Sequence, residues 1–247
     1  MSGRTIAIGD IHGCSRALRT LVENINPTAE DTLVFLGDYI DRGSDSRGVI
    51  DQLIDLQQRC NLVPLLGNHE IMFMGVVCGG MEDKIWMMCG GNATLASYGG
   101  ALRHIPPAHI DFLRCCGAYW EDEQNICVHA SYLPDQPMDR LGEQHLFWEH
   151  LSPVAPLPHI SGKRVFVGHT PQANLEVLDL GHLVCLDTYC FGGGWLTAMD
   201  LDTAEVWQAN LHGHARRQFG LAMMRRLRAA GKFVQERLSR NGSPTKH

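Results

Sequence analysis

The segment TIAIGDIHGC, residues 5–14, joins an apolar run to a short loop that holds two potential metal ligands. Residues 5–8 have the composition and length of a buried β-strand. Gly9 and Gly13 bracket Asp10 and His12, so a tight turn is expected directly after the strand. One such turn has little meaning by itself, because Gly-Asp pairs are common in turns. Its weight depends on whether the same arrangement recurs.

The same arrangement recurs further along the chain. TLVFLGDYIDRG spans residues 32–43, LVPLLGNHE spans 62–70, ICVHA spans 126–130 and RVFVGHT spans 164–170. Each is an apolar run of strand length followed by a loop that contains Asp, Asn or His. Buried strands of this kind present their carboxyl ends at one rim of an α/β sheet, where ligands bind. We therefore expect one site to be formed by Asp10, His12, Asp38, Asp41, Arg42, Asn68, His69, His129 and His169.

Helical periodicity follows the first three of these loops. Apolar residues repeat at helical spacing over 15–25 and 44–58, and a third helix is predicted from residue 70. Strand, loop and helix in this order predict a βαβαβ unit with parallel strands and right-handed crossovers. From residue 126 onward strands dominate, so we expect a mostly antiparallel second sheet that faces the first.

The segment 75–120 is harder to interpret, because three glycine pairs interrupt a stretch rich in Met and Trp. A short helix is predicted after Pro106 and Pro107. Trp86 and its neighbouring Met side chains could line a substrate groove. Packing in the core or in a cap is favoured, since Met is an ordinary filler of core gaps.

Composition indicates one soluble domain with a large core. The chain has 247 residues, of which 45% are hydrophobic, and no apolar run of about 18 residues. The N-terminal residues lead directly into a strand, so a cytoplasmic enzyme is expected. The nine cysteines show no C-x-x-C spacing, and we interpret them as reduced thiols.

Charge divides the chain into two parts. Residues 216–247 contain nine Lys or Arg and one Asp or Glu, a charge of +8. Because the net charge of the whole chain is −6, the other 215 residues carry −14. We therefore predict a catalytic domain over 1–215 and a basic C-terminal helix over 216–247. An acidic body argues against nucleic acid as a partner. The basic helix either packs on that body or binds an anionic membrane or an acidic partner. The oligomeric state stays open.

The side chains expected at the rim favour a metal-dependent hydrolase. Six of them, Asp10, His12, Asp38, Asn68, His129 and His169, are too many for one divalent ion but suit two ions that share a carboxylate. Oxygen and nitrogen ligands of this kind suit Mn, Fe or Zn. His69, oriented by Asp41, is a candidate acid for a leaving oxygen, and Arg42 is a candidate for binding phosphoryl oxygens.

These motifs resemble a known family. GDIHG (9–13), GDYIDRG (37–43), GNHE (67–70), His129-Ala130 and GHT (168–170) are similar to the phosphoprotein phosphatases of the calcineurin-like metallophosphoesterase superfamily, especially its bacterial branch. The resemblance implies a four-layer α/β/β/α sandwich of two mixed sheets flanked by helices. It also implies that Asp10 and His12 bind a first ion, that Asp38 bridges, and that Asn68, His129 and His169 bind a second. His69 with Asp41 would be the acid pair and Arg42 a phosphate clamp.

Two departures from the family pattern concern substrate binding. Bacterial relatives usually carry a second clamp arginine where this chain reads LFWEH, residues 146–150. We expect His150 to replace it, unless Arg140 or Arg103 reaches in from elsewhere and His150 is only a surface residue. Tyr189, in LDTYC, either approaches the phosphate or packs within its loop.

The leading hypothesis is a phosphatase that acts on phosphoserine or phosphothreonine in proteins. The alternative is a symmetrical dinucleoside tetraphosphatase, which shares the metal core but more often reads GNHD than GNHE. A weakly active, metal-binding regulatory module is a third hypothesis, favoured only by the missing arginine.

Overall fold

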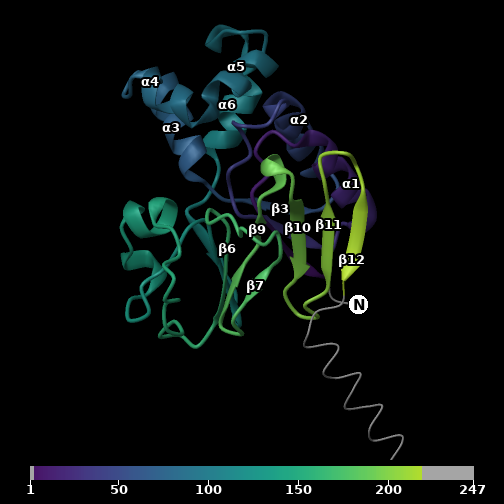
Figure 1. Cartoon of the computed structure of the whole chain (residues 1–247), viewed down its shortest axis with the longest axis vertical. Helices are drawn as coiled ribbons and strands as arrows, with labels where there is room; N and C mark the ends of the chain where they lie inside the picture. Colours follow the sequence, from purple (N-terminus) through teal and green to yellow (C-terminus); the bar gives the residue numbers. More distant parts are fainter. Residues whose placement is uncertain (1–2, 219–247) are drawn as a thin grey trace, which may run out of the picture.

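Two β-sheets pack face to face in the computed structural model, which describes residues 3–218, and helical segments cover their outer faces (Figure 1). The predicted α/β sandwich of two mixed sheets is therefore confirmed. The outer cover of the second sheet consists of short helical turns rather than long helices, because the chain between residues 131 and 162 is rich in proline.

The first sheet contains the predicted parallel unit. Its strands lie in the order β12-β11-β10-β1-β2-β3, and β9 pairs with β10. The bounds are β1 Thr5–Ile8, β2 Thr32–Phe35, β3 Asn61–Pro64, β9 Asp187–Thr188, β10 Trp195–Asp200, β11 Val206–Ala209 and β12 Ala215–Gln218. Strands β1, β2 and β3 are parallel, whereas β10 runs antiparallel to β1. All of the first three strands therefore end at the same rim.

The second sheet has the order β4-β5-β6-β8-β7. The bounds are β4 Tyr119–Glu121, β5 Asn125–Val128, β6 Arg164–Val167, β7 Leu178–Asp179 and β8 Leu183–Cys185. The prediction of a mostly antiparallel second sheet is wrong. Strands β5, β6 and β8 are parallel, and the antiparallel strands β9 to β12 extend the first sheet instead. Turn signals predicted the local hairpins, but they carry no information about which sheet edge a hairpin joins.

Helices cover the first sheet and extend beyond its rim. Their bounds are α1 Ser15–Ile25, α2 Ser46–Leu56, α3 Asn68–Val77, α4 Asp83–Trp86, α5 Asn92–Ser97 and α6 Pro107–Arg114. A π-helical turn, η1 (Met87–Gly91), joins α4 to α5, and η4 Gln144–Trp148 is a second π-helical turn. The shorter turns are η2 Leu102–His104, η3 Met138–Arg140 and η5 Cys190–Gly192. Figure 1 shows α3, α4, α5 and α6 grouped together above the sheets.

Three apolar clusters hold the layers together. One lies between the first sheet and its helices, one between the two sheets, and one between the second sheet and the segment with η3 and η4. The cluster between the sheets includes Val34 from β2, Phe166 from β6 and Met199 from β10. Burial of apolar surface on both faces explains why these strands read as unbroken apolar runs.

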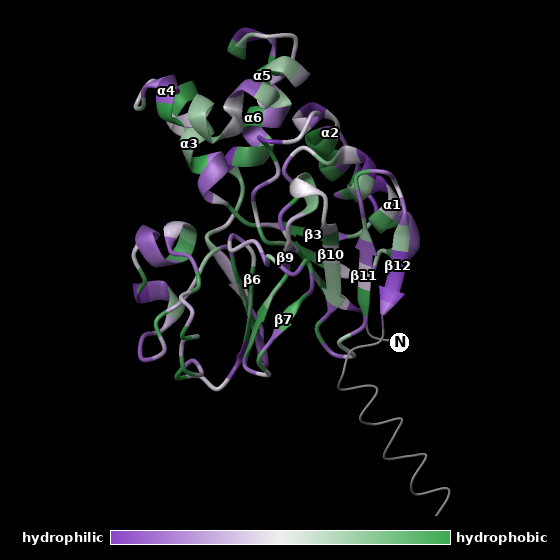
Figure 2. Ribbon diagram, viewed as in Figure 1, coloured by the Kyte–Doolittle hydropathy of each residue, from purple (hydrophilic) through white to green (hydrophobic). Residues whose placement is uncertain are grey.

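The last described strand crosses the predicted boundary, since residues 216–218, predicted to begin the basic helix, belong to β12 instead. Strand β12 begins at the predicted limit of residue 215 and pairs with β11 through Gln218, and its hydrophilic character is visible in Figure 2. The remainder of the predicted basic helix, with its proposed membrane or acidic partner, lies outside the described residues. Over residues 3–218, no helix is both long and apolar enough to cross a bilayer, and none of the nine cysteines forms a disulfide.

Candidate active site

The predicted site residues converge at the rim where the two sheets meet. Asp10 follows β1, Asp38 follows β2 and Asn68 begins α3 directly after β3. The second sheet contributes His129 after β5 and His169 after β6. Every one of the six predicted ligands is buried, with exposed fractions from 0% for His129 to 8% for Asn68.

Asp38 lies at the centre of this cluster. Its carboxylate belongs to two groups of potential ligands, one with His12 and His69 and the other with His129 and His169, and the ligand atoms of each group lie within 4.8 Å of one another. Asp38 Oδ2 is 3.4 Å from His12 Nε2, and Asp38 Oδ1 is 3.5 Å from His129 Nε2. One carboxylate thus faces two sides, as a bridging ligand would.

Asp10 completes the cluster from the side of His169. Its two carboxylate oxygens accept the backbone N–H of His169 at 3.1 and 2.9 Å. Burial, together with the nearby carboxylates of Asp187 and Asp38, raises the pKa of Asp10 well above its usual range. A cation placed among these carboxylates would remove this penalty, because opposite charge favours the ionised form.

Backbone carbonyls orient the three histidines. Nδ1 of His12 donates to Ile40 O at 2.9 Å and Nδ1 of His129 donates to Leu36 O at 2.7 Å, which leaves Nε2 of both rings without a proton. His169 is reversed, since its Nε2 donates to Trp148 O at 3.1 Å. Burial lowers the pKa of His12 and of His169 to about 3, so both rings are neutral near pH 7.

The unprotonated nitrogens fit metal ions. His129 Nε2 lies 3.1 Å from Asn68 Oδ1 and 3.5 Å from Asp38 Oδ1, so three lone pairs face one another without a proton between them. Such an arrangement is costly when buried, and a cation satisfies it. Carbonyl groups that fix the other ring nitrogen are typical of metal-binding histidines. The donor set therefore fits divalent metal.

The loop 38–42 has an unusual backbone that its surroundings hold in place. Asp38, Asp41 and Arg42 have φ values of 52°, 71° and 64°, a region that residues other than glycine seldom adopt. The carboxylate of buried Glu70 accepts the backbone N–H groups of Asp38 and Tyr39 at 2.8 and 2.9 Å, and that of Ile40 at 3.3 Å. Glu70 is the last residue of the GNHE motif, and the sequence alone predicted no role for it.

The predicted acid pair is present. His69 Nδ1 donates to Asp41 Oδ2 at 2.7 Å, and His69 Nε2 lies on the metal side, 4.0 Å from Asp38 Oδ2. Burial lowers the pKa of His69, but the carboxylates of Asp38 and Asp41 outweigh it, so the pKa is raised overall. These carboxylates therefore favour the protonated imidazole of His69. Trp86, which the sequence left between a substrate groove and packing, also contacts Asp41, as does Thr94, for which the sequence predicted no role.

The residues predicted to bind substrate form the outer edge of the site. Arg42 Nη1 donates to His12 Nε2 at 3.0 Å, and its guanidinium lies 4.8 Å from the ring centroid of Phe191. Tyr189 packs edge-on against Phe191 with centroids 4.8 Å apart, and His150 stacks on His169 at 4.2 Å. Phe191 was not predicted, because nothing in its spacing distinguishes it from a loop packing residue.

The two alternative arginines lie on short helical turns. Arg103 belongs to η2 and Arg140 to η3, and both side chains are exposed. No contact with the predicted ligands supports either of them in the described part of the chain. The structure thus brings His150, and not these arginines, next to a predicted ligand.

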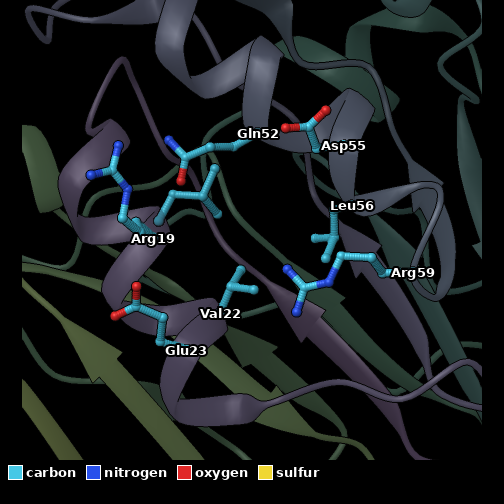
Figure 3. Close-up of a pocket in the computed structure, with 8 residues that line it drawn as sticks. Arg19, Val22, Glu23, Gln52, Asp55, Leu56 and Arg59 are labelled. Carbon is cyan, nitrogen blue, oxygen red and sulfur yellow. The ribbon is translucent and has the colours of Figure 1, made fainter.

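A separate pocket lies between α1 and α2 (Figure 3). Its volume is about 180 Å³, and its walls combine apolar side chains with charged groups of both signs. The lining residues are Leu18, Arg19, Val22, Glu23, Gln52, Asp55, Leu56 and Arg59. None of them comes from a strand end, so this pocket is distinct from the predicted site.

Buried carboxylate, amide and imidazole donors at the rim of a double sheet, with a His–Asp pair and an arginine, define a metal-dependent phosphoesterase. The model of the calcineurin-like phosphoesterase family matches residues 3–192. The chain belongs to that family.

Relatives within the family carry two different activities in their names. A symmetrical bis(5'-nucleosyl)-tetraphosphatase of Nitrosomonas europaea is 28% identical over 142 residues, which cover 55% of this chain and 47% of that protein. Serine/threonine-protein phosphatase 1 of Salmonella typhimurium is 28% identical over 200 residues, which cover 77% of this chain and 88% of that protein. The chain therefore spans less than half the length of the tetraphosphatase.

One solved structure shows the same fold over most of the chain. A protein provisionally assigned as a diadenosine tetraphosphatase superposes with a TM-score of 0.62 and 24% identity, covering 89% of this chain and 95% of that one. At this level of identity the likeness concerns the fold.

Proposed function

We propose that the site holds two divalent metal ions, Mn, Fe or Zn, and hydrolyses a phosphate ester or anhydride. The observation that supports this most strongly is the position of Asp38 between the two ligand groups. In this proposal Asp10 and His12 bind one ion, Asp38 is shared, and Asn68, His129 and His169 bind the other. Bound there, such ions polarise a phosphoryl group and make hydroxide available near neutral pH.

The chain's own side chains would do the remaining work. His69 gives a proton to the leaving oxygen, because Asp41 holds its Nδ1–H and leaves Nε2 on the metal side. Arg42 binds the non-reacting phosphoryl oxygens with a fork of N–H donors. His150 and Tyr189 contribute to substrate binding at the outer edge.

We propose a symmetrical dinucleoside tetraphosphate as the substrate. The name of the Nitrosomonas europaea relative, which is 28% identical over 142 residues, supports this choice. Hydrolysis of a protein phosphoserine or phosphothreonine is the second candidate. It is favoured by the match to the Salmonella typhimurium phosphatase, which extends over 88% of that protein.

The two candidates separate in one assay. Purified protein loaded with Mn²⁺ is incubated with diadenosine tetraphosphate, with a phosphoserine peptide and with 4-nitrophenyl phosphate. The first proposal requires that the tetraphosphate is cleaved with the highest kcat/KM and yields only the nucleoside diphosphate. Faster release of phosphate from the peptide would instead establish the second candidate, and no hydrolysis of any of the three would reject both.

A further inference from the structure

The carboxylate of Asp41 is enclosed by donors from a segment far away in the sequence. Its side chain is 0% exposed. Trp86 Nε1 donates to both of its oxygens, at 3.0 and 2.9 Å, and Thr94 Oγ1 donates to Oδ1 at 2.6 Å. Because His69 occupies Oδ2 at 2.7 Å, each oxygen has a defined set of partners. The orientation of the carboxylate is therefore determined by three side chains.

The same segment also holds the backbone of residues 41 and 42. The N–H of Asp41 donates to Thr94 Oγ1 at 2.8 Å and to Ser46 Oγ at 3.1 Å. The N–H of Arg42 donates to the carbonyl of Gly90 at 3.3 Å. Left-handed backbone at two consecutive non-glycine residues persists only where the surroundings impose it. Here the residues 86–94 supply those surroundings.

Two glycines allow the segment to approach so closely. Gly90 has a φ of +111°, and a Cβ on it would lie 2.8 Å from the backbone N of Arg42. A Cβ on Gly91 would lie 2.4 Å from the indole of Trp86. The π-helical turn η1 thus brings backbone against the loop on one side and the indole against Asp41 on the other.

Glu70 and the 86–94 segment divide the loop between them. Glu70 holds the N–H groups of residues 38 to 40, next to the metal cluster. Residues 86–94 hold Asp41, which contacts the acid His69, and Arg42 itself. Removing contacts from this second set should therefore disturb proton transfer more than metal binding.

We propose that Trp86 and Thr94 are positioning residues for proton donation, acting through Asp41 on His69. The inference rests on the proposed role of His69 as the acid. Trp86 has a donor and no acceptor, so it requires a hydrogen-bond acceptor at this position, which the Asp41 oxygens provide. Thr94 donates to the carboxylate and accepts from the Asp41 N–H, so it couples the side chain to the strained backbone.

The test uses substitutions that remove a hydrogen bond and keep the shape. Trp86→Phe removes the indole N–H, and Thr94→Val replaces the hydroxyl by a methyl group, whereas Thr94→Ser keeps the hydroxyl. Tyr98→Phe is the matched control. It removes a buried hydrogen bond at the end of α5, from Tyr98 Oη to His109 Nδ1 at 2.8 Å, without touching Asp41.

Each protein is loaded with Mn²⁺, its metal content is measured, and kcat is determined on 4-nitrophenyl phosphate and on phenyl phosphate. Phenolate is the poorer leaving group and depends more on the acid. General acid catalysis contributes about 10²–10⁴-fold. We expect Trp86→Phe and Thr94→Val to lose on the order of tenfold or more on phenyl phosphate, a few-fold on the activated ester, and no metal. Thr94→Ser and Tyr98→Phe should resemble the wild type.

Equal losses on both esters, or the same discrimination in Tyr98→Phe, would overturn the inference. A second measurement separates this failure from failure of the proposed function. The His69 Nδ1 proton, bonded to Asp41, should give a downfield NMR resonance that Asp41→Asn abolishes. Trp86→Phe and Thr94→Val should shift or broaden this resonance even if the wild-type protein hydrolyses neither ester. An unchanged resonance in both variants would exclude a positioning role.

Discussion

Two regions of the site differ in how they are held. Residues 38–41 are buried, and each of the five backbone N–H groups of the loop 38–42 has a partner in Glu70, Thr94, Ser46 or Gly90. At the outer edge the side chains of His150, Tyr189 and Phe191 make ring contacts, and His150 is exposed. The difference indicates that the chemistry is preorganised, whereas the edge that meets the substrate can change at little cost to the fold.

The largest effect is expected at the centre of the first region. Asp38→Asn should lower metal content and activity together, because one carboxylate serves both ligand groups. The loss of metal affinity should exceed the roughly 10–100-fold that follows removal of an outer partner of a ligand. Metal analysis after dialysis, together with turnover of 4-nitrophenyl phosphate, measures both. Two tightly bound ions and normal turnover in this variant would contradict the bridging role.

Replacing the acid should separate metal binding from catalysis. His69→Asn is expected to keep its metal and to lose about 10²–10⁴-fold in kcat on an ester with a poor leaving group, with a smaller loss on an activated one. The measurement is kcat over a series of aryl phosphates. If all esters lose activity equally, His69 does not donate the proton.

Weakening the support that Glu70 gives to the loop 38–42 should have a smaller effect. It should lower both the free energy of unfolding and the metal affinity. Glu70→Gln replaces an acceptor oxygen by an NH₂ group, so at least one backbone N–H loses its partner, which costs about 1–3 kcal/mol. We expect urea unfolding to show this loss and metal affinity to fall with it. Exposed Glu30 provides the control, because Glu30→Gln should change neither quantity.

Substitution in the second region should change substrate affinity alone. His150→Arg would provide a permanent charge and a second donor for the phosphoryl group, worth about 1.5–3 kcal/mol, or tenfold or more in KM. Arginine stays charged over the whole range from about pH 6 to about pH 9, so the gain should persist across it. KM for one phosphomonoester across this range is the readout. If KM is the same in His150→Arg and the wild type at every pH, the second phosphate clamp comes from another residue.

The smallest effect is expected at Phe191. Its ring covers the guanidinium of Arg42, and a cation–π contact at an exposed site is worth about 0.5–1 kcal/mol. Phe191→Leu should therefore raise KM about two- to fivefold and leave kcat and unfolding unchanged. A fall in stability would place Phe191 with the rigid region instead.

The same difference explains what the sequence could predict. Asp10, Asp38, Asn68, His129 and His169 each follow an apolar run of strand length, so a local pattern places them at the rim. The contacts of Trp86 and Thr94 with Asp41 join residues 45 and 53 positions apart, and no local pattern reports them.

The sheet arrangement was predictable to a similar extent. The helices after the first three loops place β1, β2 and β3 in parallel, since a crossover of that length permits little else. The hairpins after residue 187 were predictable as hairpins. Their addition to the edge of the first sheet depends on pairing between β1 and β10, almost 200 residues apart, which periodicity cannot reveal.

The carbonyl contacts of the three histidines make the proposed ligands distinguishable by magnetic resonance. His12 and His129 turn Nε2 toward the cluster, while His169 turns Nδ1 toward it. In a protein labelled with a nitrogen isotope and loaded with a spin-active diamagnetic metal, two rings should show coupling through one nitrogen and the third through the other. Each of the two ion positions would then report its own occupancy, and sequential loading could be followed ring by ring.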